Sequence, residues 1–170
     1  MEILKVENLK FSYPLTTSPA INNISFKINR GEFIAVCGAT GSGKSTLLRL
    51  LKPELSPLGE KSGEIIFDGI SFSKLSSSPK ASEIGFVMQN PEHQIVTDTV
   101  WHELVFGLEN LNVPQAAMAR RIAETATYFG IESWYDKKVS ELSGGQKQLL
   151  NLASVTVMEP SVLILDEPTS

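Results

Sequence analysis

Gly38-Ala39-Thr40-Gly41-Ser42-Gly43-Lys44-Ser45 is the stretch of sequence that decides the fold. It matches the pattern G-x-x-x-x-G-K-[ST] at every fixed position. Its glycines let the backbone curl until several N–H groups face one point, which forms an anion nest at the start of a helix. Lys44 places a cation against the β- and γ-phosphates of a nucleotide, and the Ser45 hydroxyl can ligate Mg²⁺. The stretch therefore predicts a nucleoside triphosphate site, although kinases, GTPases and motor ATPases all share it.

The segments around this loop predict strands and a helix. Residues 33–37 are continuously apolar and predict a strand buried on both faces, with Cys37 as a buried structural thiol. Residues 44–51 have helical character up to Pro53. Alternation of polar and apolar residues predicts strands at 3–13 and 24–28, with a turn at 29–31.

The rest of the chain changes from strand to helix and back. Residues 53–63 and 71–80 are rich in Ser, Pro and Gly and predict loops, with a turn between strands at Asp68-Gly69. Residues 84–88 and 162–165 predict buried strands. Apolar residues at helical spacing predict helices at about 100–111, 114–129 and 144–158, the second capped by Gly130. The sequence thus predicts one α/β domain over residues 1–170, with a helical insert at about 95–145.

Two carboxylates, Asp166 and Glu167, directly follow the predicted strand at 162–165. At the carboxyl edge of a parallel sheet, this strand end lies beside the phosphate loop. Asp166 suits the magnesium shell, and Glu167 can reach the attacking water as a general base. The alternative interpretation is an acidic pair that caps a helix.

Leu142-Ser143-Gly144-Gly145-Gln146 precedes the last predicted helix. Ser143 and Gln146 have the spacing of a capping box. Two glycines in the first turn leave backbone N–H groups bare, so this helix start is itself an anion site. A well-capped helix explains Ser143 and Gln146, but it explains the glycines poorly because they weaken a first turn.

Composition limits the classes of function. The net charge is −4, and no cluster of Lys or Arg appears in the 170 residues, so the basic surface of a nucleic-acid binder is missing. No apolar run approaches the roughly 20 residues that span a bilayer. Any membrane association is therefore expected to run through a protein partner. The single cysteine favours a reducing cytoplasm, and His93 and His102 have no neighbouring Cys or Asp cluster that would complete a metal site.

The phosphate loop, the LSGGQ segment and the acid pair together resemble the ATP-binding-cassette (ABC) nucleotide-binding domain, whose signature is LSGGQ. The resemblance covers essentially all 170 residues. It implies an α/β P-loop NTPase with a mixed sheet core, an antiparallel β subdomain and a helical insert. It also implies that Gln89 senses Mg²⁺ and water and links to a membrane subunit, and that Tyr13 stacks on adenine.

The resemblance implies three sets of site residues for ATP and Mg²⁺. Glu167 and Gln89 are the candidate catalytic residues, and Ser45, Gln89 and Asp166 are the candidate metal ligands. The candidate nucleotide-binding residues are Tyr13, Gly38, Ala39, Thr40, Gly41, Ser42, Gly43, Lys44, Ser45, Thr46, Ser143, Gly144, Gly145 and Gln146. Ser143, Gly144 and Gly145 would contact the γ-phosphate held by a second such domain, so that two domains enclose two nucleotides.

The segment Gln89-Asn90-Pro91-Glu92-His93-Gln94-Ile95-Val96, with Thr99-Val100 and residues 105–110, is similar to energy-coupling-factor importer ATPases, which drive uptake of vitamins, cobalt or nickel. Leu149 departs from this pattern, since many relatives carry Arg there. The implied partners are a second ABC ATPase domain, a transmembrane coupling subunit and a substrate-binding membrane subunit, with no nucleic acid. The implied location is peripheral, on the cytoplasmic face of the cell membrane.

Two other functions stay open from the sequence. One is a soluble ABC ATPase of translation or DNA repair, and the other is a non-catalytic module that ATP clamps. In the family a D-loop and a switch histidine follow the segment that ends at Thr169-Ser170, and neither is among these residues. We therefore expect a piece of a longer cassette protein, or of one with two such domains. The sequence leaves open whether these 170 residues alone hydrolyse ATP.

Overall fold

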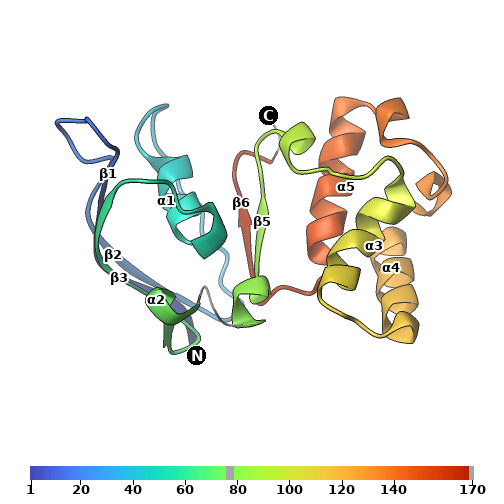
Figure 1. Ribbon diagram of the computed structural model, residues 1–170, viewed down its shortest axis with the longest axis horizontal. Coiled ribbons are helices and arrows are strands. Elements are labelled where there is room, and N and C mark those ends of the chain that lie inside the picture. The colour runs from blue at the N-terminus through green and yellow to red at the C-terminus, as the bar shows by residue number, and fades with distance from the viewer. Residues whose placement is uncertain (76–78, 169–170) are drawn as a thin grey trace. The chain divides into compact units, whose positions relative to one another are not determined.

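The computed structural model describes residues 1–75 and 79–168. The chain divides into two compact units, Met1–Ala81 and Ser82–Ser170, which run from blue to green and from green to red in Figure 1. Part of the predicted loop at 71–80, and the predicted chain end at Thr169 and Ser170, lie outside the described residues.

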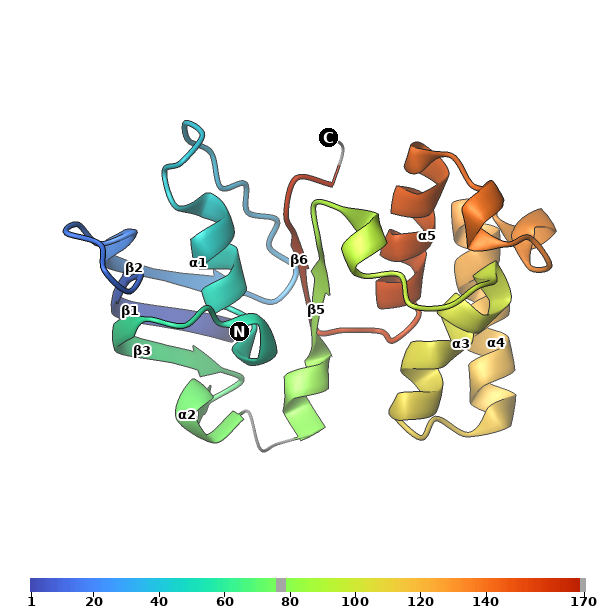
Figure 2. The same cartoon turned by 45° about the horizontal axis from the view of Figure 1, so that its top comes forward.

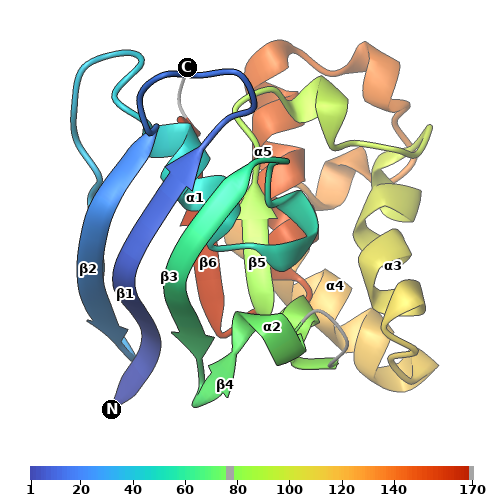
Figure 3. The same cartoon turned by 60° about the vertical axis from the view of Figure 1, so that its left-hand side comes forward.

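The first unit is built on an antiparallel sheet in the order β2–β1–β3–β4. Its strands are β1 (Glu2–Ser12), β2 (Ile21–Asn29), β3 (Glu60–Phe67) and β4 (Ile70–Ser71), and Figure 3 shows the first three side by side. Around Asn8, which has a φ of 49°, the register of β1 shifts. The bulge changes which side chains point inward, from Leu4 and Val6 to Leu9 and Phe11. The predicted strands at 3–13 and 24–28 are confirmed.

Helix α1 (Lys44–Leu50) buries Leu47 and Leu50, and Figure 2 shows it lying over one face of this sheet. A 3-10 turn at Pro53–Leu55 follows it, because proline cannot continue the hydrogen-bond ladder of a helix. The predicted helix is confirmed. The first unit also contains the short helix α2 (Phe72–Leu75).

Four sequence predictions in this unit are wrong. Residues 33–37 form no strand: none of the described strands pairs with them, and a strand persists only where a neighbour takes up its backbone groups. Their side chains are therefore exposed, and Cys37 is an exposed thiol rather than a buried one. The predicted loop at 53–63 contains the start of β3, because β1 offers a pairing edge there. The predicted loop at 71–80 contains α2, which Phe72 and Leu75 anchor by burial.

The second unit contains a parallel pair of strands, β5 (Ile84–Val87) and β6 (Val162–Leu165), with Val87 opposite Leu165. All four residues of β5 are buried, as predicted. The prediction for β6 was only half right: the strand forms, but Leu163 is 40% exposed and only Ile164 is buried. Parallel pairing brings the carboxyl ends of the two strands to the same edge.

Three helices, α3 (Val100–Asn110), α4 (Gln115–Phe129) and α5 (Gly144–Thr156), pack together in the second unit (Figure 1). Each matches a predicted helix, and Gly130, at a φ of 67°, caps α4 as predicted. Short 3-10 turns lie at Pro79–Glu83, Pro91–His93, Glu132–Trp134 and Val139–Glu141. No helix in the described part of the chain is long and apolar enough to cross a membrane. The shared core of the helices consists of Val100, Leu104, Val105, Leu108, Ile122, Ala126, Ile131, Leu142, Leu150, Ala153 and Val157.

Candidate functional site

The phosphate loop needs glycine at two positions because of the backbone conformation there. Gly41 and Gly43 have φ values of 80° and 93°, in the left-handed region that other residues rarely adopt. A Cβ on Gly43 would also lie 2.6 Å from the carbonyl oxygen of Ala20. The loop can therefore enter α1 in this conformation only with glycine at position 43.

Lys44 lies across this loop. Its Nζ donates hydrogen bonds to the carbonyl oxygens of Gly38 at 2.9 Å and Ala39 at 3.0 Å. Ser42 closes the same curl by donating its N–H to Ala39 O at 3.1 Å. The ammonium group is thus held beside the exposed loop by neutral carbonyl oxygens. A phosphate oxygen would be a stronger, charged acceptor for it.

Tyr13 and the start of α1 are in contact. The Tyr13 hydroxyl and Thr46 Oγ1 lie 3.0 Å apart within hydrogen-bond reach, and Phe11 packs edge-on against the Tyr13 ring at 5.0 Å. Tyr13 remains 36% exposed. The structure therefore brings the predicted adenine-stacking residue and the phosphate-loop helix together in the first unit.

The predicted acid pair and Gln89 meet at the carboxyl ends of β5 and β6. Asp166 is buried, and its N–H donates to Val87 O at 3.0 Å. Glu167 is exposed and has a φ of 48°. Gln89 Nε2 donates to Glu167 Oε2 at 2.7 Å across 78 positions of sequence. The structure thus joins the two residues that the sequence proposes as catalytic.

The signature segment forms the predicted capping box. Ser143 N–H donates to Gln146 Oε1 at 2.8 Å, and Gln146 N–H donates to Ser143 Oγ at 3.3 Å. Gly144 and Gly145 are exposed, and nothing in the described chain lies within 4 Å of a Cβ added to either. Packing inside the described residues therefore does not explain why both positions are glycine.

The predicted site residues fall into both units. Tyr13 and the phosphate loop belong to the first unit, while Gln89, the signature segment and the acid pair belong to the second. His93 and His102 are exposed, and His102 Nδ1 lies 3.0 Å from Thr99 Oγ1 at the start of α3. Within residues 1–75 and 79–168 no group of three or more His, Cys, Asp or Glu side chains could hold a metal ion by itself.

Further contacts join the segment after Gln89 to α5. Lys147 Nζ pairs with Glu92 Oε1 at 2.7 Å, and the hydrogen bond and charge of Lys147 lower the pKa of the Glu92 carboxyl. Gln94 bonds to β5 and to Asn151 of α5. Gln94 lies within the quoted importer-like segment, but its contacts depend on the tertiary fold, so the sequence carried no signal for them.

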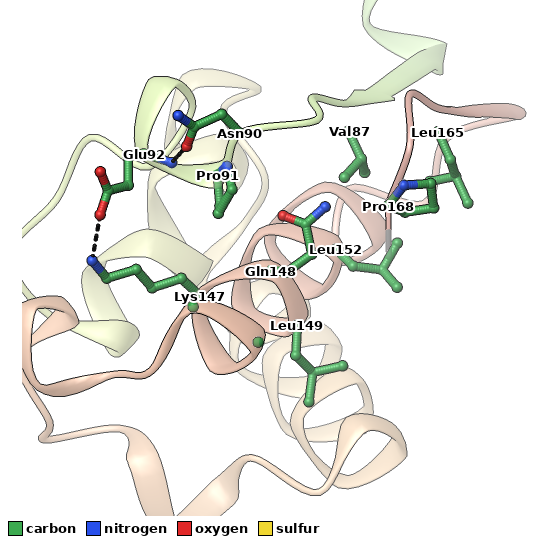
Figure 4. Close-up of a pocket in the computed structure, with 12 residues that line it drawn as sticks. Val87, Asn90, Pro91, Glu92, Lys147, Gln148, Leu149, Leu152, Leu165 and Pro168 are labelled. Atoms are coloured by element: carbon green, nitrogen blue, oxygen red, sulfur yellow. Dashed lines mark hydrogen bonds and ion pairs between the residues drawn. The ribbon is translucent and has the colours of Figure 1, made fainter. Parts of the chain in front are cut away.

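A pocket of about 560 Å³ lies in the second unit between the segment after β5 and the start of α5. Figure 4 shows Asn90, Pro91 and Glu92 on one side of it and Leu149 and Leu152 of α5 on another. Gly144 and Gly145 also line it. The signature glycines and the segment after Gln89 thus face one shared space.

The family model described as ABC transporter matches residues 21–170. A Bacillus cereus protein described as an ABC transporter ATP-binding protein is 46% identical over 166 residues, which are 98% of this chain and 30% of that protein. The energy-coupling factor transporter ATP-binding protein EcfA1 of Mycoplasmopsis synoviae is 40% identical over 169 residues, which are 99% of this chain and 62% of that protein. The chain therefore spans about a third of the length of the first relative and less than two thirds of the second.

Solved structures give the same family. One is cbiO1 from Clostridium perfringens, part of the ABC transporter complex cbiONQ, with a TM-score of 0.82, 37% identity, and coverage of 99% of this chain and 66% of that one. Another is a dimeric ATP-binding cassette in a post-hydrolysis state bound to ADP and Pi, with a TM-score of 0.83, 25% identity, and coverage of 98% and 75%. The predicted fold class, a P-loop NTPase of ABC type, is confirmed.

Proposed function

The chain belongs to the ABC transporter family, and we propose that it binds ATP with Mg²⁺ and hydrolyses it to power a membrane importer. The relatives EcfA1 and cbiO1 favour an importer of the energy-coupling-factor type. Its cargo would be a vitamin or a cobalt or nickel ion. One cassette domain over residues 1–170 would carry out this chemistry as part of the whole protein.

The observation that carries the proposal is the 2.7 Å hydrogen bond from Gln89 Nε2 to Glu167 Oε2. A general base must lie within hydrogen-bond reach of the proton that it takes, and it works best when its orientation is fixed. The donated bond orients the Glu167 carboxylate, which would act on water as the general base. Gln89 would thereby help to align that water as well.

The residues of the first unit suit a bound nucleotide. The loop from Gly38 to Gly43 offers backbone N–H groups at the start of α1, and Lys44 supplies a positive charge for the β- and γ-phosphates. Tyr13 supplies a half-exposed ring for the adenine. Thr46, bonded to Tyr13, would hold that ring close to the phosphate end of the site.

The donor set also fits Mg²⁺, which prefers hard oxygen ligands. The Ser45 hydroxyl, the Asp166 carboxylate and the Gln89 amide oxygen are the residues that would hold it. When bound, the ion would neutralise charge that develops on the transferred phosphoryl group.

Hydrolysis needs one proton transfer and one bond exchange at phosphorus. Glu167 would accept a proton from a water molecule as the water oxygen bonds to the γ-phosphorus. The bond from that phosphorus to the bridging β–γ oxygen would break, leaving ADP and phosphate. Lys44 would stabilise the negative charge on the phosphoryl oxygens during this exchange.

A second ABC ATPase domain would complete each site. Ser143, Gly144 and Gly145 would contact the γ-phosphate held by the partner domain, and their exposure at the start of α5 suits such an approach. The other partners would be a transmembrane coupling subunit and a substrate-binding membrane subunit. The protein would lie on the cytoplasmic face of the membrane, and the net charge of −4 gives no support to nucleic acid as a partner.

Lys44→Ala tests ATP hydrolysis in the protein expressed from its complete coding region. We expect phosphate release to fall by about 10²–10³-fold, because the cation that stabilises the transferred phosphoryl group is lost. Lys27→Ala, an exposed lysine on β2, is the matched control and should leave the rate unchanged. Wild-type protein that releases no phosphate, even with its membrane subunits, would rule out the enzymatic proposal.

The importer part has its own test. The protein should co-purify with a transmembrane subunit. Vesicles that contain the complex should take up labelled cobalt, nickel or vitamin only when ATP is supplied on the side of the membrane where the ATPase lies. A protein that hydrolyses ATP freely but never associates with a membrane subunit would argue for the soluble ABC ATPase instead.

A further inference from the structure

The side chain of Gln94 lies along the outer edge of β5. Its Oε1 accepts a hydrogen bond from Met88 N–H at 2.8 Å, and its Nε2 donates one to Phe86 O at 2.7 Å. The opposite edge of this strand faces β6, where Val87 O accepts from Asp166 N–H at 3.0 Å. Gln94 therefore occupies the place that a further strand would take.

The chemistry of the primary amide explains why this residue type can do so. A side-chain carboxamide carries an N–H donor and a C=O acceptor in one plane, as a backbone peptide does. Gln94 meets the C=O of Phe86 in β5 and the N–H of Met88 directly after it, which lie on the same edge of the strand. If the side-chain amide of Gln94 were flipped, its NH₂ group would face the donors Met88 N–H and Asn151 Nδ2. The hydrogen bonds therefore fix which way the Gln94 amide points.

These two bonds close the segment from Gln89 to His93 into a tight loop. Inside the loop, Asn90 Oδ1 accepts from Glu92 N–H at 2.9 Å, and Pro91 O accepts from Gln94 N–H at 3.0 Å and from Ile95 N–H at 2.9 Å. Gln89 is the first residue of the loop, next to Met88. Its backbone therefore moves little unless the Gln94 bonds break.

Helix α5 supports Gln94 from the other side. Asn151 is fully buried, and its Nδ2 donates to Gln94 Oε1 at 3.1 Å. Gln148 Nε2 lies 3.5 Å from Met88 O, at the limit of a hydrogen bond, and Figure 4 shows Gln148 beside the pocket. The charged groups nearest in sequence and on α5, Glu92 and Lys147, pair with each other. Gln94 is thus held by neutral amides.

We propose that Gln94 is a positioning residue for ATP hydrolysis: by capping the edge of β5 it fixes the loop that holds the Gln89 amide against Glu167. The inference rests on the proposed function, since it concerns the orientation of the same general base. Gln94 acts through Gln89 and touches neither ATP nor water itself.

The test is a set of variants in the protein expressed from its complete coding region, assayed for phosphate release. Gln94→Glu keeps the shape but loses the donor to Phe86 O, and it places a carboxylate beside that carbonyl. We expect kcat to fall by roughly ten- to a hundredfold, because a displaced catalytic group costs about that much. The KM for ATP should stay within about twofold, because ground-state binding through the phosphate loop is unchanged. Gln115→Glu, an exposed residue at the start of α4, is the control with the same charge change and should keep the wild-type kcat.

The decisive comparison is the double variant with Gln89→Ala. If Gln94 acts only through Gln89, Gln94→Glu should lower kcat no further in the Gln89→Ala background, because residues that act as a unit are not additive. Losses that multiply, or a Gln94→Glu protein with wild-type kcat, overturn the inference. Gln94→Met replaces the glutamate variant if that one does not fold. A wild-type protein without hydrolysis is a separate result, which contradicts the proposed function instead.

Discussion

The ion pair between Glu92 and Lys147 joins the loop after β5 to the first turn of α5. Nζ and Oε1 lie 2.7 Å apart, with 20% of the lysine side chain and 65% of the glutamate side chain exposed. The exposure keeps the energy of such a pair small. Its position matters more, because it connects the segment that carries Gln89 with the signature helix.

This pair predicts a local pH dependence. The Lys147 hydrogen bond, and then its charge, lower the pKa of Glu92 below its ordinary value of 4.5. A carboxyl with a lowered folded-state pKa contributes stability above its unfolded pKa, and this is lost as the pH falls through the folded value. The Glu92–Lys147 contact should therefore persist at neutral pH and break only below about pH 4.5.

Carboxyl NMR titration measures this directly. In wild-type protein Glu92 should titrate at a lower pH than in Lys147→Met, where the lysine hydrogen bond and charge are absent. Identical titration of Glu92 in the two proteins would contradict the contact.

The site residues differ in how far sequence could predict them. Lys44, Glu167 and the signature glycines stand in motifs because their chemistry demands fixed residue types at fixed spacing. The resemblance to the ABC domain implied catalytic roles for both Gln89 and Glu167, and the structure places Gln89 Nε2 2.7 Å from Glu167 Oε2. Gln94 had no such signal, because its role depends on which edge of β5 the fold leaves without a strand.

Among the elements, α5 combines a strong helix start with two residues that weaken it. The capping box of Ser143 and Gln146 takes up backbone donors at its first turn. Gly144 and Gly145 form the same turn, and neither has a positive φ. The helix therefore tolerates alanine there, and the proposed approach of a partner's phosphate would account for the glycines.

Gly145→Ala should separate helix stability from function. We expect the free energy of unfolding to rise by up to about 1 kcal/mol, since alanine is the better helix former. The melting temperature would rise by about 2–4 °C per kcal/mol in a chain of this size. ATP hydrolysis should nevertheless fall, because the added methyl group would block the partner's phosphate.

Calorimetry and phosphate release, measured on the same sample, check both halves of this expectation. Thr127→Ala, at an exposed position of α4, also replaces a weaker helix former by alanine and should stabilise the protein without loss of rate. A Gly145→Ala protein that is both more stable and fully active would show that nothing approaches this turn closely.

Helices and strands could be predicted where the apolar pattern of the local sequence agrees with the packing or strand pairing in the fold. The helices α3, α4 and α5 follow apolar periodicity, and β5 follows its buried run. The start of β3 escaped prediction because Ser62 and Gly63 are typical turn residues. Gly63 is needed because β1 approaches closely at the Asn8 bulge, where a Cβ would lie 2.4 Å from Asn8 O. Residues 33–37 have the composition of a buried strand, but composition cannot supply the neighbour that a strand needs.

At the scale of the whole molecule, the residues proposed to bind ATP come from both units of the chain. The first unit supplies the phosphate loop and Tyr13, and the second supplies Gln89 and the acid pair. The signature of a partner domain would supply the remainder.

Glu167→Gln tests the proposed two-domain site. In the variant the side-chain oxygen at position 167 can still accept the hydrogen bond from Gln89 Nε2, but the general base is lost. The rate of hydrolysis should therefore fall by about 10²–10⁴-fold. With ATP and Mg²⁺ it should accumulate as a dimer at concentrations where the wild-type protein is monomeric, because the nucleotide that joins the two copies is not consumed. Size-exclusion chromatography with light scattering measures the mass. Glu109→Gln, on the exposed face of α3, should behave as wild type. A Glu167→Gln protein that stays monomeric with ATP would contradict the two-domain site.

The amide of Gln94 has a second consequence, for the solubility of the protein. Ile84–Val87 is a short, uncharged and wholly buried strand, the kind of segment that recruits strands from other chains when its edge is open. The side chain of Gln94 forms hydrogen bonds with a C=O and an N–H group at that edge. A side chain cannot continue the backbone hydrogen bonds of a sheet as another strand would. The same side chain thus covers part of the strand edge that sheet growth between chains would need.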